Sequence, residues 1–369
     1  MDINVQFMKN DFFLLSLSNP SSMRIKRSSI GGHHKKIKQL SFMTKNELEI
    51  GNKIQQIKYY FLKYEIIVSY SSIQVGKMNN YVIDQLDTVY NTNNQYLLLE
   101  YNQPYNQPYS QSHIDFENWL LTIKTPKQFI YHIIDSYGSI IHNLILLEDN
   151  SVCLFDFSTD SIVFTRNTYR PILKNFENSI LLDKLKNTKV NKPYIVNIIK
   201  NIKNFTYKPL EIHLLFYIIM NNEITLSYSL MEIICDNFIK NLTVLDYFSL
   251  EYKNSFRNEC IILLKSFINK DKTFIIDEII QYYKTWDNYN ISILYIHLFS
   301  TITHVFSLQE TFLNKFVKIL LKNIHPNPSK RETLKTTNES YEILWSENTD
   351  WTFVNDIPMD KMMDLHEAL

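Results

Sequence analysis

The apolar residues in the first part of the chain mostly follow the two-residue period of β-strands. Alternating segments cover 64–70 and 81–86, and the run Tyr96–Tyr101 is typical of a buried strand that ends in polar residues. One helix is expected among these strands, because Thr44 and Glu47 have capping-box spacing ahead of apolar residues at helical intervals. Upstream, short apolar runs and a basic stretch predict short strands and a loop.

The later part of the chain has the apolar period of helices. Helices are predicted over 115–123 and over 126–147, where a proline occupies the first helical position. The segment 151–164 has the pattern of an apolar strand, a polar turn and a second apolar strand. Long apolar-periodic segments continue from Glu211 onward, so most of this part is expected to be helical.

A polar segment with a repeated Tyr-Asn-Gln-Pro, at 101–108, is predicted to link the two parts. The fold class is therefore expected to be α+β. A small strand-rich unit would occupy 1–101, and a larger helical unit would occupy 109–369.

Composition and charge narrow the function classes. The chain has 369 residues, 45% of them hydrophobic, and 38 basic against 38 acidic side chains, so no global field attracts nucleic acid or an anionic membrane. The three cysteines form neither a CxxC pair nor a disulfide pattern, which favours a reducing compartment. Without a signal peptide or an apolar run of about 18 residues, we expect a soluble intracellular protein with no nucleic-acid or membrane partner.

The usual phosphate-binding and metal-binding motifs do not occur. The chain has five glycines, and neither GxGxxG nor a P-loop motif is found. The histidines at 113, 142, 213 and 325 show no ligand spacing such as HExxH, so no metal site is predicted.

One motif in the helical part carries specific chemistry. Leu154-Phe155-Asp156 is followed by Ser161 and an apolar triplet, Ile162-Val163-Phe164. This resembles the catalytic loop of protein kinases, in which His-Arg-Asp is followed five residues later by Asn. The resemblance places Asp156 at the position of the catalytic base and Ser161 at the position of the Mg²⁺-binding Asn.

Four later segments resemble kinase motifs in the family order. Asn175-Phe176-Glu177 is similar to Asp-Phe-Gly, and Glu211 ends a segment similar to Ala-Pro-Glu. Asp287 begins a helix like the central helix of the kinase C-lobe, where the resemblance implies that it braces the catalytic loop. Arg331 lies in a segment similar to the late Pro-x-x-x-Arg turn, and the resemblance implies a structural ion pair between Glu211 and Arg331.

The strand-rich part resembles a kinase N-lobe. Lys36-Ile37-Lys38 is similar to the strand that carries the phosphate-pairing lysine, with the choice between the two lysines open, and Glu47 is similar to its helical partner. Leu99 takes the gatekeeper position and Glu100 and Tyr101 the hinge. Leu99, Glu100, Tyr101, Ser161 and Asn175 would then surround a nucleotide.

The resemblance covers roughly residues 36–335 and is greatest to the diverged Ser/Thr kinase-like proteins of giant DNA viruses, of mimivirus type. It implies a two-lobed kinase-like fold and a location in the host cytoplasm or the virion. The segment 212–285 is longer than kinases normally allow and is expected to be a helical insertion. The tail 338–369 would dock on the body or bind a partner.

A second register of the kinase motifs is also open. Asn143–Leu147 followed by Asp156-Phe157-Ser158 would mimic Asn-Ile-Leu-Leu and Asp-Phe-Gly. It would place Gly138 at the catalytic Asp and interrupt the helix predicted over 126–147. Neither register contains a complete set of catalytic residues.

In the register that places Asp156 at the catalytic base, most of the residues that phosphoryl transfer needs are replaced. Kinases hold two Mg²⁺ ions with the Asp of Asp-Phe-Gly and the Asn of the catalytic loop, and Asn175 and Ser161 are weaker ligands. Ser158 replaces the catalytic-loop lysine, and Glu177 adds a negative charge near the phosphate position. The resemblance thus implies a pseudokinase with a regulatory or scaffolding role, protein partners and weak binding of ATP. The alternatives are an active Ser/Thr kinase that uses Mg²⁺ in an atypical way, or an unrelated helical interaction protein.

Overall fold

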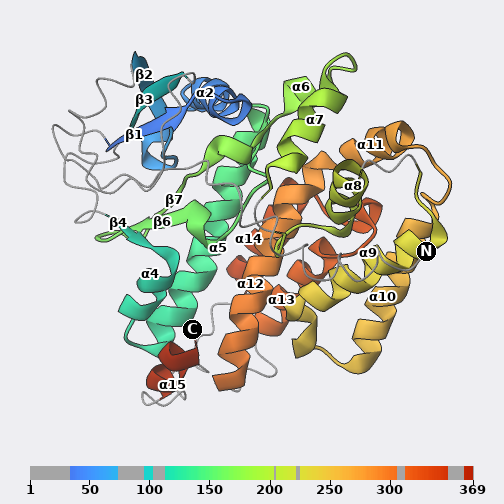
Figure 1. Ribbon diagram of the computed structural model, residues 1–369. Helices are drawn as coiled ribbons and strands as arrows, with labels where there is room; N and C mark the ends of the chain where they lie inside the picture. The colour runs from blue at the N-terminus through green and yellow to red at the C-terminus, as the bar shows by residue number, and fades with distance from the viewer. Residues whose placement is uncertain are drawn as a thin grey trace.

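The computed structural model describes residues 34–73, 95–102, 113–202, 205–221, 225–305, 312–347 and 361–368. The fold is α+β, with small antiparallel sheets and many helices (Figure 1). The strands are β1 (His34–Gln39), β2 (Ile67–Ile73), β3 (Tyr96–Tyr101), β4 (His113–Asp115), β5 (Val152–Cys153), β6 (Ile162–Thr165), β7 (Pro171–Leu173) and β8 (Ile180–Leu181). The helices are α2 (Phe42–Ile54), α4 (Phe116–Thr122), α5 (Pro126–Asp149), α6 (Leu182–Lys186), α7 (Asn191–Lys200), α8 (Leu210–Met220), α9 (Tyr228–Asn241), α10 (Leu250–Lys265), α11 (Lys272–Ile280), α12 (Trp286–Val305), α13 (Phe312–Asn323), α14 (Leu334–Glu347) and α15 (Lys361–Ala368).

The first sheet has the strand order β1-β3-β2, and α2 packs against it. The predicted strand Tyr96–Tyr101 is confirmed as its central strand. The expected helix is present but begins earlier than predicted, because Ser41 is the N-cap and its hydroxyl accepts from the Thr44 amide. Thr44 instead lies inside the helix, where its hydroxyl donates to the Gln39 carbonyl at 2.7 Å.

Two smaller sheets connect the catalytic-loop-like segment to its surroundings. One has the order β4-β6-β7, and the other pairs β5 with β8. The strand, turn and strand predicted over 151–164 are present as β5 and β6. A bridge from Tyr64 to Leu173 joins the region after α2 to β7, so residues 175–177 follow directly from a strand anchored near the first sheet.

The predicted helix over 126–147 is confirmed as α5, which is continuous to Asp149 and begins with Pro126 behind a Thr125 N-cap. This continuity contradicts the second kinase register, which needs a catalytic loop at Gly138. A Cβ atom at Gly138 would lie 2.7 Å from the Tyr341 ring on α14, so the glycine allows close packing of two helices. Helices α5 and α12 lie side by side in the core, where Ser136 and Tyr295 share a 2.7 Å hydrogen bond (Figure 1).

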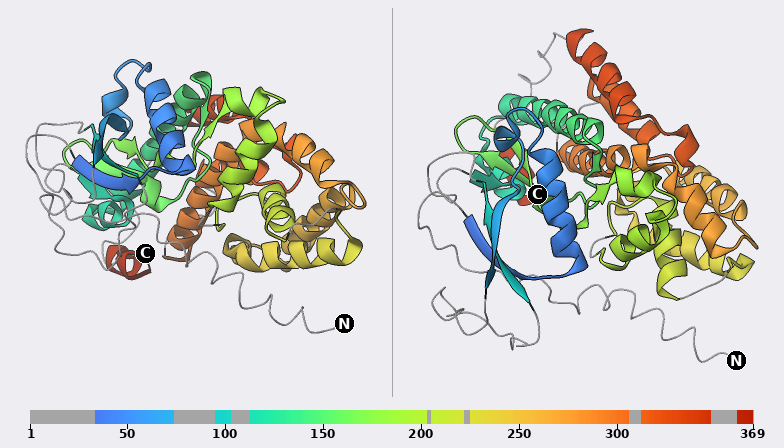
Figure 2. Two further views of the ribbon diagram at one scale, coloured as in Figure 1. Left: turned by 45° about the horizontal axis from the view of Figure 1, so that its top comes forward. Right: turned by 90° about the horizontal axis from the view of Figure 1, so that it is seen from above.

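The segment 212–285 is helical, as predicted, and contains most of α8 together with α9, α10 and α11. Figure 2 shows these helices at the opposite end of the molecule from β1 and α2. The last helix of the tail, α15, docks on the body, because its Met362 and Leu365 are buried in the main core. The expectations for 1–33, for the strand 81–86, for the link at 103–108 and for 348–360 lie outside the described residues.

Candidate functional site

Of the two candidate lysines, Lys38 lies between two carboxylates. Its Nζ atom is 2.7 Å from Glu47 Oε2 and 2.9 Å from Glu177 Oε2. The Tyr101 hydroxyl donates to the other Glu47 oxygen at 2.9 Å. Burial alone lowers the pKa of Lys38, but the charge of Glu47, with that of Glu177, outweighs burial and holds this pKa well above its ordinary value. Lys38 is therefore a fixed cation that two neighbouring carboxylates already neutralise.

The other candidate lysine has a different role. The Lys36 ammonium lies 4.6 Å from the centroid of the Tyr101 ring, a cation–π contact. Burial lowers the pKa of Lys36. The structure thus pairs Lys38, and not Lys36, with Glu47, and the carboxylate of Glu47 serves this pair rather than the helix cap.

The predicted nucleotide-contacting residues of β3 lie on two faces of the strand. Leu99 is fully buried and packs with Ile67, Leu97 and Tyr101 between the sheet and α2. Glu100 lies on the other face, where it pairs with Lys35 at 2.6 Å. Of the three residues predicted in β3, Tyr101 hydrogen-bonds to the Lys38–Glu47 pair through its hydroxyl.

Asp156 is engaged by two neighbours. Its Oδ1 atom is 3.0 Å from Lys208 Nζ, and its Oδ2 atom accepts from Asn178 Nδ2 at 2.6 Å. Lys208 is almost fully buried, with a side-chain exposure of 1%, and also donates to the Phe155 carbonyl at 2.6 Å. A hydroxyl substrate would therefore have to compete with an ammonium and an amide for this carboxylate.

Ser161 and Asn175 both bond to the loop that contains Asp156. The Ser161 hydroxyl donates to the Asp156 carbonyl at 3.1 Å, and the Ser158 amide donates back to it at 3.2 Å. Asn175 has a left-handed backbone, with φ 67°, and its side-chain amide donates to the Asp160 carbonyl at 2.9 Å. Hard divalent cations prefer carboxylates. These two residues therefore fit Mg²⁺ poorly, and over the described residues no cluster of three or more His, Cys, Asp or Glu side chains is present.

Asp287 binds the loop before Asp156, and a second buried contact lies elsewhere in the helical part. Asp287 accepts from the Leu154 amide at 2.8 Å and from the Phe155 amide at 2.7 Å. Burial raises the pKa of Asp287, and these hydrogen bonds act in the opposite direction. The predicted pair of Glu211 with Arg331 is also present, with N–O distances of 2.6 and 2.9 Å.

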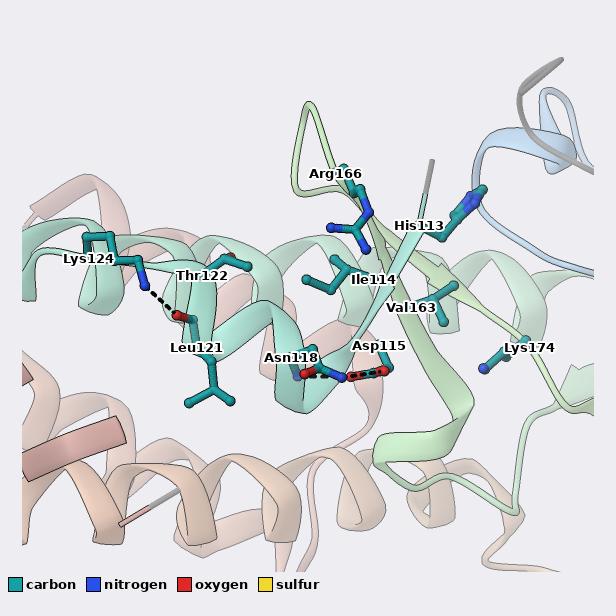
Figure 3. Close-up of a pocket in the computed structure, with 10 residues that line it drawn as sticks. All are labelled: His113, Ile114, Asp115, Asn118, Leu121, Thr122, Lys124, Val163, Arg166 and Lys174. Atoms are coloured by element: carbon teal, nitrogen blue, oxygen red, sulfur yellow. Dashed lines mark hydrogen bonds between the residues drawn. The ribbon is translucent and has the colours of Figure 1, made fainter. Parts of the chain in front are cut away.

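A cavity of about 750 Å³ lies beside β4, α4 and β6 (Figure 3). Three cationic side chains from separate segments line it: Lys124 after α4, Arg166 after β6 and Lys174 after β7. Burial alone raises the pKa of Asp115 at the start of α4, but hydrogen bonds from Asn118 and the charge of Lys174 outweigh it and leave this pKa below its ordinary value. The cavity can accept a small anionic or polar molecule.

Sequence reasoning missed Lys208, Asn178 and the cations of the cavity. Lys208 directly precedes Pro209 of the segment that resembles Ala-Pro-Glu, but the sequence alone does not distinguish a buried lysine from an exposed one. Lys124, Arg166 and Lys174 are separated along the chain; the sheet order β4-β6-β7 and the packing of α4 against β4 and β6 bring them to one cavity. No short motif could have joined them.

No protein-family model matches the chain, and no curated protein matches it. Over the described residues, no helix is both long and apolar enough to cross a bilayer.

Proposed function

We propose that this chain is an intracellular, kinase-like protein that does not transfer phosphate and that acts as a regulatory scaffold for a protein partner. The observation that carries the proposal is the salt bridge from Lys38 to Glu177. In kinases this lysine pairs with the nucleotide phosphates and with one helical Glu. Here a second carboxylate takes the place that a phosphate would need.

Four contacts support the kinase-like part of the proposal. Lys38 pairs with Glu47 of α2, and Ser161 bonds the loop that contains Asp156. Asp287 at the start of α12 binds two amides of that loop, as the resemblance implies. The buried ion pair of Glu211 with Arg331 is the fourth. The last two contacts join segments 120 or more residues apart, and a chance resemblance in one motif would produce neither of them.

The loss of activity follows from charge and geometry. Glu177 would repel the phosphates of a nucleotide, and binding would require breaking its bond to Lys38. Phosphoryl transfer depends on metal ions and cations that neutralise the developing charge, and Asn175 and Ser161 supply no carboxylate for them. The exposed apolar side chains Leu250 and Ile262 on α10 suit contact with a protein partner.

A second candidate function is weak, metal-independent binding of a nucleotide such as ATP in the cavity. Arg166 and Lys174 favour it, because two cations can contact a phosphate where no metal is bound. An active Ser/Thr kinase would instead need Mg²⁺ and a free Asp156 carboxylate. An unrelated helical interaction protein would bind no nucleotide at all.

The test is a phosphoryl-transfer assay with labelled ATP and Mg²⁺ or Mn²⁺ on a general Ser/Thr peptide mixture. We expect the wild-type protein to give no more product than Asp156→Asn, which has nearly the same shape but lacks the charge of a catalytic base. A wild-type rate well above that of Asp156→Asn would establish an active kinase and overturn the proposal.

A further inference from the structure

The cavity beside β4, α4 and β6 concentrates positive charge in a chain whose formal net charge is zero. Lys124, Arg166 and Lys174 line it, and among the described residues none of the three is in a salt bridge. The only carboxylate among the lining residues is Asp115, which already accepts two hydrogen bonds from Asn118. The cavity therefore offers a ligand more positive than negative charge.

The charged groups of the cavity are open to solvent. Lys124, Arg166 and Asp115 are exposed, and Lys174 is half-buried. A cleft lined mainly by one sign of charge raises the local concentration of ligands of the opposite sign. A negatively charged ligand can therefore reach these cations without a rearrangement of the fold.

The three cations are spread along the cavity. Figure 3 shows Lys124 at one end, Lys174 at the other and Arg166 between them. A compact anion bound at one end would leave the cation at the other end without a counter-charge. An extended chain that carries several carboxylates can pair with all three cations at once.

The walls of the cavity suit a peptide. All three residues of β4 line it, and over the described residues β4 pairs with β6 alone, so its other edge has no strand partner there. An extended peptide can lie beside such an edge strand. The exposed side chain of Leu121 also lines the cavity and offers apolar surface between the charged groups.

We propose that this cavity binds an extended acidic segment of a protein partner, with Asp and Glu side chains of the partner paired to Lys124, Arg166 and Lys174. The inference rests on the proposed scaffold function, because it names the surface by which the scaffold holds its partner. Exposed salt bridges contribute little one by one, so several must form together. The complex should therefore weaken as the salt concentration rises.

The experiment begins with a phage-displayed library of random peptides of about twelve residues, selected on the folded full-length protein without nucleotide or metal. We expect the selected peptides to be enriched in Asp and Glu. Fluorescence anisotropy then measures the affinity of the strongest peptide, labelled with fluorescein. Arg166→Gln and Lys174→Gln should each weaken binding about three- to fivefold, and their combination about tenfold or more.

The matched control is Lys265→Gln, which removes the same charge from an exposed lysine at the end of α10, away from the cavity (Figure 1). It should leave the affinity unchanged within about a factor of two. Selected peptides that are not acidic would overturn the proposal. So would a loss in Lys265→Gln as large as that in Arg166→Gln, or binding that does not depend on the salt concentration. Displacement of the peptide by an equal concentration of ATP would also overturn it, because the cavity would then be a nucleotide site.

This test and the test of the proposed function fail separately. Phosphoryl transfer by a protein that still binds acidic peptides through Arg166 and Lys174 would overturn the proposed function and support the peptide site. A protein that neither transfers phosphate nor binds acidic peptides would overturn the peptide site alone.

Discussion

The buried ion pair between Glu211 and Arg331 should be among the most sensitive positions of the chain. Their side chains are 1% and 0% exposed, and the guanidinium also donates to the carbonyls of His325 and Pro326. It lies 4.8 Å from the centroid of the Tyr289 ring. Glu211→Gln would leave a buried guanidinium fixed in place without its counter-charge.

The expected loss is about 3–5 kcal/mol in the free energy of unfolding, because a buried charge that loses its partner keeps its full desolvation cost. Replacing both partners, in Glu211→Leu with Arg331→Met, should cost less than the sum of the two single changes by about 2 kcal/mol or more. The matched control is Asp183→Asn, which breaks an exposed pair with Lys53 at 2.8 Å. That change should cost less than about 1 kcal/mol.

Urea unfolding followed by tryptophan fluorescence measures all five variants, namely Glu211→Gln, the two single changes Glu211→Leu and Arg331→Met, their combination, and Asp183→Asn, and Trp286 in α12 is a suitable buried probe. The reasoning is refuted if Glu211→Gln unfolds at the same urea concentration as Asp183→Asn. A double variant no more stable than the sum of its parts would show that the two side chains act independently.

Three further predictions concern other parts of the fold. Burial lowers the pKa of His213 from 6.5 to about 4. The unfolded chain therefore binds a proton at His213 more readily than the folded protein does, so stability should fall as the pH drops from 6.5 towards 4. In urea unfolding, the wild type should lose about 2 kcal/mol more than His213→Gln between pH 7 and pH 5, and equal losses would contradict this. Gly138→Ala should lower the unfolding free energy by about 1–3 kcal/mol despite the better helix propensity of alanine, because the new methyl group meets Tyr341. The same change should cost less when it is made in a Tyr341→Leu background. Lys38→Met should lower the free energy of unfolding by about 2–4 kcal/mol, because it leaves the carboxylates of Glu47 and Glu177 facing each other. Glu177→Gln should lower it by about 1 kcal/mol or less. The reverse order would show that Glu177 is the main support of this cluster.

Strong periodic patterns made much of the fold predictable. The strand Tyr96–Tyr101 and the helix α5 were predicted closely, because a long apolar period with a proline at the first helical position leaves few alternatives. The start of α2 was missed because Ser41 and Thr44 are both good caps, and the packing of Thr44 against the Gln39 carbonyl decides between them.

The candidate site was only partly predictable, because tertiary packing decides between residues that the sequence pattern leaves equivalent. The resemblance to kinase motifs implied the pair of Glu211 with Arg331, which the structure contains, and it narrowed the lysine to two residues of one strand. It could not choose Lys38 over Lys36, because both lie on the same face of β1 and only the distance to α2 separates them. The pairing of Lys208 with Asp156 depends on where the chain returns after α7, which is a property of tertiary packing alone.

The most direct test of the central claim is the melting temperature of the protein with ATP and ADP, each with and without Mg²⁺ or Mn²⁺. Ligand that binds the native state at a hundredfold excess over Kd adds about 2.7 kcal/mol of stability, which is readily measured. The account predicts no metal-dependent increase in the melting temperature. An increase without metal that Lys174→Ala abolishes would assign weak nucleotide binding to the cavity. An increase that requires metal and disappears in Asp156→Ala would contradict the account and make the protein a working kinase.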